Sequence, residues 1–420
     1  MSEPIKLIVL GCGSRGNGYA NFAAANPGRT QVVAVADPRD FYRNRTGDLC
    51  GVPEERRYRS WTEVAALPKF ADAVLICTQD AMHTEPAIAF ARMGYHIMLE
   101  KPMAPTAAEC RKIVEEVKKA GIFFAVCHVL RYTAFSRLLK KTLDAGTIGE
   151  LVSIQHLEPV RHWHQAHSFV RGNWRNEKES SFMLLAKCCH DVDWIRYMMN
   201  VPCEKIQSFG SLKHFTRANQ PAGAADRCTD CPAEIEANCP YSAIKIYLRD
   251  RVYQGNCKWP TAVLTSDVTP EGVLKALREG PYGRCVYCCD NDVVDNQVVN
   301  FSFAGDRTGQ MVMTAFCNED GRQTRIFGTR GSIRTDSRII HVTDFLTERQ
   351  YDLDSGTIDD GSILSGHGGG DFGLMDAFIR AMETNDRSYI LSGVDETLES
   401  HLMVFAAEES RRTGKVIEVR

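Results

Sequence analysis

Short apolar runs alternate with helical patterns through the first third of the chain. Strands are expected at 5–10, 31–36, 73–77, 96–99 and 122–126, and the spacing of apolar positions between them predicts helices such as 84–93 and 106–120. Strands that alternate with amphipathic helices are typical of a doubly wound parallel sheet. The pattern therefore predicts an α/β domain over residues 1–126.

Beyond residue 127 the pattern changes. Helices are expected near 134–145 and 181–198, strands near 151–158, 204–211, 297–303, 309–316, 323–328 and 338–343, and a closing helix pair near 371–384 and 393–412. Strands with few helices between them favour a largely antiparallel sheet. We therefore expect an α+β domain over 127–420, which contains a polar, cysteine-rich insertion at about 213–296.

Composition excludes several classes of partner. Fifty Lys and Arg against 53 Asp and Glu give a formal charge of −3, and no basic block is present. Such a chain is not expected to bind nucleic acid or an anionic membrane surface. No secretory signal pattern and no apolar run of membrane-spanning length is found, so we expect a cytoplasmic protein whose 16 cysteines are mostly reduced.

The segment 6–37 has the spacing of a dinucleotide-binding turn. The first strand ends at Gly11, glycines recur at Gly13 and Gly16, a helix of small residues follows, and the second strand ends at Asp37. The first glycine permits the tight turn, the second lets backbone amides approach a pyrophosphate, and the third lets the helix pack on the strand. Asp37 is placed to bind a ribose and favours NAD, although Arg39 leaves NADP open. The residues expected to bind the cofactor here are Gly11, Gly13, Ser14, Arg15, Gly16 and Asp37.

Two later strands bring polar residues to the same edge of the sheet. The third strand runs into Thr78, with His83 following, and the fourth runs into Glu100 and Lys101. Ligands bind at the carboxyl edge of such sheets. We therefore expect Thr78, His83, Glu100 and Lys101 to contact the cofactor, with Lys101 near its nicotinamide end.

Four segments together resemble the glucose-fructose oxidoreductase and inositol dehydrogenase (Gfo/Idh/MocA) family. They are GCGSRG at 11–16, LEKPMA at 99–104, GTIGEL at 146–151 and CCHDVD at 188–193. The resemblance covers essentially the whole chain. It implies a Rossmann domain, an α+β domain with an open sheet that often makes oligomer contacts, and oxidation or reduction of a sugar or cyclitol hydroxyl with a nicotinamide cofactor.

By the same resemblance, Lys101 matches the lysine of the family's EKP motif and His190 its catalytic histidine. Chemistry supports both roles, because hydride loss from a carbinol carbon needs a base for the hydroxyl proton and a cation beside the developing alkoxide. The family usually has Asp where this chain has Ala186. Helical spacing would place Lys187 beside both His190 and Asp191. Lys187 is either a second catalytic cation or the partner of Asp191 in a surface ion pair.

A histidine- and tryptophan-rich stretch follows the first strand of the second domain. Residues 156–174 contain four histidines and two tryptophans, and Arg175 comes next. Aromatic faces and polar side chains of this kind suit a sugar site, whereas metal binding by His164 and His167 is disfavoured without a nearby carboxylate motif. A glycine cluster around His367 suggests a loop that touches the substrate. The expected substrate-binding residues are Arg131, Tyr132, His164, Trp174, Arg175, Lys187, Asp191 and His367.

The insertion contains the most metal-like cysteine array. Cys228, Cys231 and Cys239 have zinc-ligand spacing, and Cys289, or alternatively Cys285, could supply the fourth thiolate. A structural zinc would offset the weak apolar face of the insertion. An iron–sulfur cluster is less favoured, and three buried thiols without metal are the alternative.

These observations predict an NAD-dependent oxidoreductase that acts on a secondary hydroxyl of a sugar, sugar derivative or cyclitol and forms a homo-oligomer. A second hypothesis is a glycoside hydrolase that oxidises its substrate transiently, eliminates the aglycone, adds water and reduces the ketone again with the same NAD. A third is a protein that senses NAD or a sugar without turnover. The presence of both Lys101 and His190 argues against the third.

Overall fold

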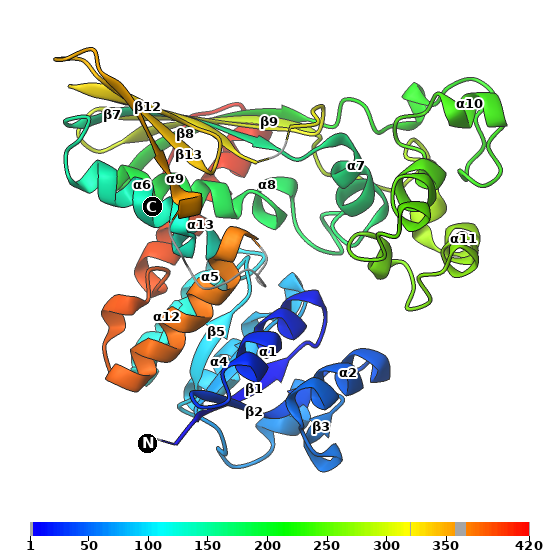
Figure 1. The fold of residues 1–420 in the computed structure, drawn as a ribbon, viewed down its shortest axis with the longest axis horizontal. Coiled ribbons are helices and arrows are strands. Elements are labelled where there is room, and N and C mark those ends of the chain that lie inside the picture. Colours follow the sequence, from blue (N-terminus) through cyan, green and yellow to red (C-terminus); the bar gives the residue numbers. More distant parts are fainter. Residues whose placement is uncertain (1–2, 320, 358–366, 420) are drawn as a thin grey trace.

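The fold was analysed in a computed structural model, which describes residues 3–319, 321–357 and 367–419. Its first sheet has six parallel strands in the order β3-β2-β1-β4-β5-β6 (Figure 1). The strands are β1 (Ile5–Leu10), β2 (Thr30–Ala36), β3 (Arg57–Tyr58), β4 (Ala73–Ile76), β5 (His96–Leu99) and β6 (Phe124–Val126). Both faces of this sheet are buried, which explains why its strands are continuous apolar runs. The predicted doubly wound sheet is confirmed.

Helices cover the two faces of the parallel sheet. They are α1 (Ser14–Ala25), α2 (Asp40–Cys50), α3 (Trp61–Ala65), α4 (Thr84–Arg92) and α5 (Ala107–Ala120). The ends of α5 show why it forms where it does: Thr106 accepts a hydrogen bond from the amide of Glu109 at the start, and Gly121 adopts φ +63° at the end.

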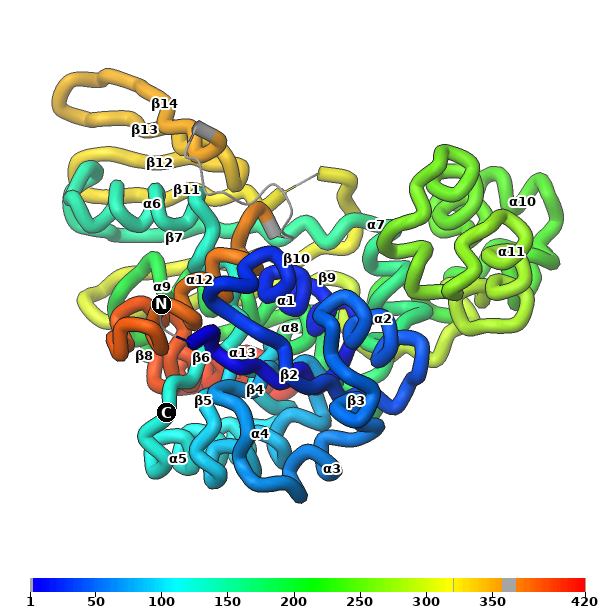
Figure 2. Tube along the Cα trace, turned by 60° about the horizontal axis from the view of Figure 1, so that its bottom comes forward, coloured from blue at the N-terminus to red at the C-terminus, as the bar shows by residue number. Residues whose placement is uncertain are grey.

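The second sheet has nine strands in the order β14-β13-β12-β11-β7-β10-β9-β8-β15 (Figure 2). Only the central pair β7 and β10 is parallel among the described strand pairs of this sheet, so the predicted, largely antiparallel sheet is confirmed. The strands are β7 (Leu151–Pro159), β8 (Cys203–Ser211), β9 (Asn296–Phe303), β10 (Arg307–Thr314), β11 (Gln323–Gly328), β12 (Gly331–Thr335), β13 (Ile339–Asp344), β14 (Gln350–Asp354) and β15 (Ile417–Glu418).

One face of this sheet packs on helices, and the last two helices connect it to the first sheet. The helices of this part are α6 (Ala134–Asp144), α7 (His162–His164), α8 (Met183–Ala186), α9 (Cys189–Met199), α12 (Gly370–Thr384) and α13 (Val394–Thr413). Leu374 and Phe378 of α12 are buried in the same core as Leu7 and Val9 of β1. The chain therefore returns to the first sheet after completing the second, and α12 lies beside it in Figure 1.

The insertion projects from one side of the molecule, next to α7 (Figure 1). It contains α10 (Ala233–Ala237), α11 (Pro270–Glu279) and several shorter turns. Its own small core includes Phe215, Tyr247 and Val273, and Ala166 and Val170 of the preceding segment share that core. The insertion is thus packed against the stretch that follows β7.

No helix within residues 3–319, 321–357 and 367–419 is long and apolar enough to span a bilayer.

Candidate active site

The glycine turn has the close packing that its spacing predicts. Gly11 adopts φ +87°, and a Cβ there would lie 2.4 Å from the carbonyl oxygen of Cys77. A Cβ at Gly16 would lie 2.0 Å from the carbonyl oxygen of Gly11, so the backbones of the helix and the turn are too close to leave room for a side chain. At Gly13 the nearest atom would be the Arg39 guanidinium at 3.7 Å, which leaves the start of α1 open to a pyrophosphate.

Asp37 lies buried at the end of β2 and faces this turn. Its carboxylate accepts hydrogen bonds from the amide of Cys12 and from the amide and guanidinium of Arg39, all at 2.9 Å. Burial opposes ionisation, but these donors outweigh it and hold the pKa of Asp37 below its usual value. The open start of α1 and this ionised carboxylate fit the pyrophosphate and ribose of a dinucleotide. With Arg39 already paired to Asp37, the site fits NAD better than NADP.

Arg15 connects the glycine turn to helix α12. Its guanidinium donates to Glu100 at 2.7 Å and to both carboxylate oxygens of Asp371 in α12 at 2.8 Å. Tyr19 donates to the same Glu100 oxygen at 2.7 Å. Arg15 and Glu100, both expected to contact the cofactor, are therefore engaged with protein partners that lock α12 against the nucleotide-binding edge.

Lys101 follows Glu100 in a cis Lys101–Pro102 peptide and reaches across to the second domain. Its ammonium donates to the carbonyl oxygen of Ala186 at 2.7 Å. That carbonyl ends α8, and the single helix expected over 181–198 is wrong: α8 ends at Ala186 and α9 begins at Cys189. The carbonyl at the end of α8 thus accepts a hydrogen bond from Lys101, and Lys187 lies between the two helices.

The break gives Lys187 a partner that helical spacing does not indicate. Its ammonium pairs with Glu158 of β7 at 3.0 Å, so the expected surface pair between Lys187 and Asp191 is wrong. Asp191 is fully buried and instead pairs with Arg322 and with His156, whose Nε2 is 3.0 Å away. Burial opposes its ionisation, but the Arg322 guanidinium outweighs it and holds the pKa of Asp191 well below its usual range.

Arg322 is a residue that sequence reasoning missed. It lies just before β11 and contacts both Glu158, at 3.0 Å, and Asp191. Two buried carboxylates are thereby matched by two cations and a histidine. No local pattern marks Arg322, because its partners lie more than 130 residues earlier in the chain.

His190 lies in the first turn of α9 beside a second buried histidine. Its ring centroid is 5.8 Å from that of His128, and 6% of His190 is exposed. Burial lowers the pKa of His128 to about 3, despite the carboxylate of Asp193 at 3.8 Å. His128 is therefore neutral at physiological pH and adds no positive charge beside His190.

His164 completes the group near Lys101. Burial and, next, the charge of Lys187 hold the pKa of His164 well below its usual value, and Lys101 acts in the same direction. His164 is thus a neutral imidazole close to both ammonium groups. Its ring lies 5.9 Å from that of Phe169, which in turn lies 6.3 Å from the half-exposed Trp174. The charges of Lys187 and Lys101 both act on His164, so the three residues stay candidates for one site.

Several other expected site residues make protein contacts. Arg131 is 2% exposed and binds both carboxylate oxygens of Asp193 at 2.7 Å, and the hydroxyl of Tyr132 bonds to Ser392 at 2.9 Å. The guanidinium of Arg175 pairs with Asp290 and Glu179. These three side chains hold segments together. The side chain of His367 lies outside the described residues.

Two further cofactor candidates, His83 and Thr78, bond to backbone atoms. The ring nitrogens of His83 lie 2.8 Å from the carbonyl oxygen of Pro102 and 3.1 Å from that of Thr78. The hydroxyl of Thr78 donates to Met82 at 3.3 Å. His83 is completely buried and fixes the loop that carries Lys101.

The cysteines of the insertion do not form the predicted zinc site. Within the described residues, no group of three or more His, Cys, Asp or Glu side chains is arranged to hold a metal ion. The guanidinium of Arg171 lies 3.4 Å from the sulfur of Cys228, and Cys289 donates to the carbonyl of Cys285 at 3.3 Å. Cys228 and Cys289 thus interact with protein groups, and the described thiols do not form a metal-binding cluster.

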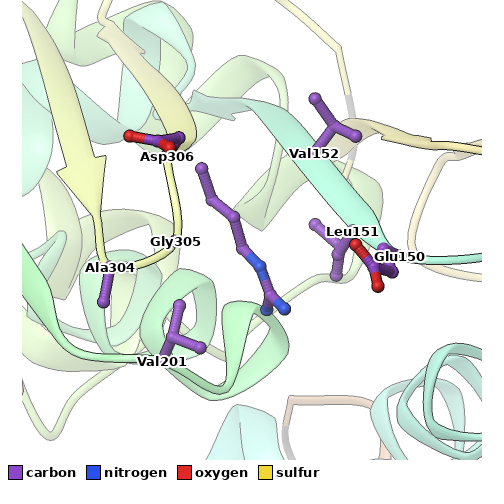
Figure 3. Close-up of a pocket in the computed structure, with 8 residues that line it drawn as sticks. Glu150, Leu151, Val152, Val201, Ala304, Gly305 and Asp306 are labelled. Carbon is purple, nitrogen blue, oxygen red and sulfur yellow. The ribbon is translucent and has the colours of Figure 1, made fainter.

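A groove of 390 Å³ opens at the far end of the second sheet (Figure 3). Leu151 and Val152 of β7 line it together with Val201 and Ala304. Glu158 is seven residues further along β7, a distance of about 23 Å at the rise of an extended strand. This groove is separate from the group around Lys101.

The glycine turn, the buried acid at β2 and the lysine at β5 are the features of a dinucleotide-binding Rossmann domain. Residues 5–128 match the family model for the NAD-binding Rossmann domain of this oxidoreductase family, and 140–419 match the model for its C-terminal α/β domain. The chain belongs to the Gfo/Idh/MocA family.

Relatives with assigned activities match part of the chain. A 2,7-anhydro-N-acetylneuraminate hydratase from Escherichia coli is 27% identical over 49% of this chain and 53% of its own length. A myo-inositol 2-dehydrogenase from Thermotoga maritima is 28% identical over 43% of this chain and 51% of its own length. The chain spans about half the length of these curated relatives.

Solved structures match the whole fold. An oxidoreductase from Agrobacterium radiobacter, in complex with NAD⁺, L-tartaric acid and magnesium, is 14% identical with a TM-score of 0.70 and covers 100% of this chain and 99% of its own. A levoglucosan dehydrogenase in complex with NADH and L-sorbose is 18% identical with a TM-score of 0.72 and covers all of both chains. At these identities the match establishes the fold.

Proposed function

We propose that this protein is an NAD-dependent oxidoreductase that transfers a hydride between nicotinamide and a secondary hydroxyl of a sugar, sugar derivative or cyclitol. The observation that carries the proposal is the position of Lys101. It follows the cofactor-binding edge directly and reaches the break between α8 and α9, the helix that carries His190. Family membership and the relatives that act on inositols support the same assignment.

Each residue has a separate chemical role in this proposal. Bound NAD supplies the hydride acceptor or donor. Lys101 donates a hydrogen bond to the substrate oxygen and stabilises negative charge that develops there. His190 accepts the hydroxyl proton during oxidation and returns it during reduction. Lys187, which forms an ion pair with Glu158, adds a second cation near that oxygen.

The test is one assay with two readouts. Free sugars, inositols and aryl glycosides are incubated with the protein and NAD, and NADH absorbance and aglycone release are followed together. Net NADH with an inositol or sugar identifies a dehydrogenase. Lys101→Ala and His190→Ala should each lower kcat/KM by about 10² or more while NAD binding stays nearly unchanged. Lys112→Ala, at an exposed position of α5, is the matched control and should keep full activity.

A redox-neutral glycosidase is the second candidate. Two observations favour it: Ala186 stands where the family usually has Asp, and a relative is named as a hydratase of an anhydro sugar. Aglycone release that requires NAD but accumulates no NADH would establish it. Silence in both readouts with NAD bound would support a sensing role.

Assembly, location and metal content stay proposals. We propose a cytoplasmic homo-oligomer, and light scattering of the eluting protein measures its mass directly. A structural zinc in the insertion requires its thiols to move, because the described side chains there are not arranged to hold a metal ion. Metal analysis of the purified protein, repeated for Cys228→Ser, decides whether zinc is bound at all.

A further inference from the structure

The insertion places an indole directly against the predicted substrate site. The ring of Trp259 lies 5.0 Å from that of His164, 5.4 Å from Trp163 and 5.5 Å from His167. All three partners belong to the segment after β7, whereas Trp259 is about 90 residues further along the chain. With 45% of its surface exposed, Trp259 still presents a large apolar face to solvent.

His164 links this face to the reacting groups. Its depressed pKa, which burial causes first, also reflects the nearby charges of Lys187 and Lys101. The contacts give the same link. Lys187 directly follows Ala186, whose carbonyl oxygen binds Lys101, and it pairs with Glu158, six residues before His164. The indole of Trp259 packs against His164 with ring centroids 5.0 Å apart. A substrate bound at Lys101 would have Trp259 beside it on the side of the insertion.

The rings of Trp163, His164, His167 and Trp259 form an aromatic wall. Side chains of the insertion pack against it and hold it in place. The guanidinium carbon of Arg251 lies 4.2 Å from the ring centroid of Trp163. His167 bonds to the hydroxyl of Tyr247 at 2.8 Å and stacks on Tyr282 with ring centroids 4.9 Å apart. Three of these supporting side chains, Arg251, Tyr247 and Tyr282, come from the insertion. The wall therefore does not need a ligand to assemble.

We propose that Trp259 is a specificity-determining residue, which binds a ring-shaped or apolar substituent that extends from the reacting sugar. This inference rests on the proposed function of the site. An indole that is 45% exposed suits stacking on sugar C–H surfaces or on an aromatic aglycone. The substrate class is accordingly a glycoside or other two-ring compound, with its first ring at Lys101 and its second at Trp259.

The test measures binding, so it does not depend on turnover. Methyl and phenyl β-glycosides of glucose, galactose and N-acetylglucosamine are titrated calorimetrically into the full-length protein saturated with NAD. For at least one sugar the phenyl glycoside should bind about five- to tenfold more tightly than the methyl glycoside, as expected for one aromatic contact. Trp259→Ala should abolish this ratio, and Trp259→Phe should keep most of it.

Tyr253→Ala is the matched control, because Tyr253 is a 60% exposed aromatic residue of the same insertion. This variant should keep the ratio. Equal binding of methyl and phenyl glycosides, no binding of any of them, or a ratio that survives in Trp259→Ala would each overturn the inference. A phenyl preference that depends on Trp259, together with silence in both readouts of the activity assay, would leave the inference intact and remove the proposed function.

Discussion

Replacing Asp193 by Asn tests whether Arg131 is a structural or a substrate-binding residue. Sequence reasoning placed Arg131 in the sugar pocket, but the structure pairs its guanidinium with both oxygens of Asp193 at 2.7 Å. The two side chains are 3% and 1% exposed. Burial opposes ionisation of Asp193, yet Arg131 outweighs it and holds the pKa of Asp193 below its usual value. Asp193→Asn keeps the shape of the side chain and removes its charge.

The expected loss follows from this geometry. Removing one partner of a buried ion pair leaves the other charge desolvated and unpaired, which costs about 3–5 kcal/mol. The hydrogen bond that Ser400 donates to Asp193 at 2.9 Å can persist with Asn, so the loss comes mainly from the stranded guanidinium. Because Arg131 does not contact substrate in this interpretation, KM should stay within about twofold of the unmodified protein.

The assay is urea unfolding followed by fluorescence, with substrate kinetics on the same preparations. Asp395→Asn is the matched control: it removes the same charge from an ion pair with Lys118 in which Asp395 is 68% exposed. Exposed pairs of this kind contribute about 1 kcal/mol or less. If Asp193→Asn lost no more than this control while KM rose several-fold, Arg131 would be a substrate-binding residue and the structural interpretation would be wrong.

Three further predictions concern the cofactor site and pH. Gly16→Ala should weaken NAD binding at least about tenfold and lower Tm, because its Cβ would lie 2.0 Å from the Gly11 carbonyl oxygen, whereas Gly18→Ala, with open space around its Cβ, should do neither. Asp37→Ser should shift the ratio of NADP to NAD dissociation constants towards NADP, because it removes the carboxylate and releases Arg39 for a 2′-phosphate; an unchanged ratio would contradict the role of Asp37. Burial lowers the pKa of His128 from 6.5 to about 3. As pH falls, His128 is therefore protonated in the unfolded chain at a higher pH than in the folded protein. The stability that His128 contributes is therefore complete above about pH 6.5 and declines towards pH 3, and His128→Asn should flatten the plot of Tm against pH over that window.

Local sequence was sufficient for most elements of the fold. Five of the six parallel strands were found because both their faces are buried, which makes them apolar runs. The sixth, β3 (Arg57–Tyr58), was missed because it has only two residues and is half-buried. The strand β14 (Gln350–Asp354) was missed because it is an edge strand whose residues are mostly exposed and polar. The break between α8 and α9 was missed because no glycine or proline marks it; the carbonyl of Ala186 at the break accepts a hydrogen bond from Lys101, 85 residues earlier.

The sequence by itself determined the chemistry of the nucleotide-binding turn. Glycine spacing and a terminal acid depend on backbone sterics within about 30 residues, so Gly11, Gly16 and Asp37 occupy the places their pattern predicts. The sequence also placed Lys101 at the edge of the sheet that carries the glycine turn, because the carboxyl ends of all strands in a parallel sheet lie at one edge.

Tertiary structure alone decided how the charges of the second domain are paired and which aromatic residues surround the site. Arg322 and Glu158 meet across strands, and Trp259 reaches His164 from an insertion about 90 residues away. Nothing near these residues in the chain indicates their partners, since each contact depends on how complete elements pack. The insertion appeared in the sequence as a candidate metal site, and in the folded protein its Trp259 packs on the aromatic residues that follow β7.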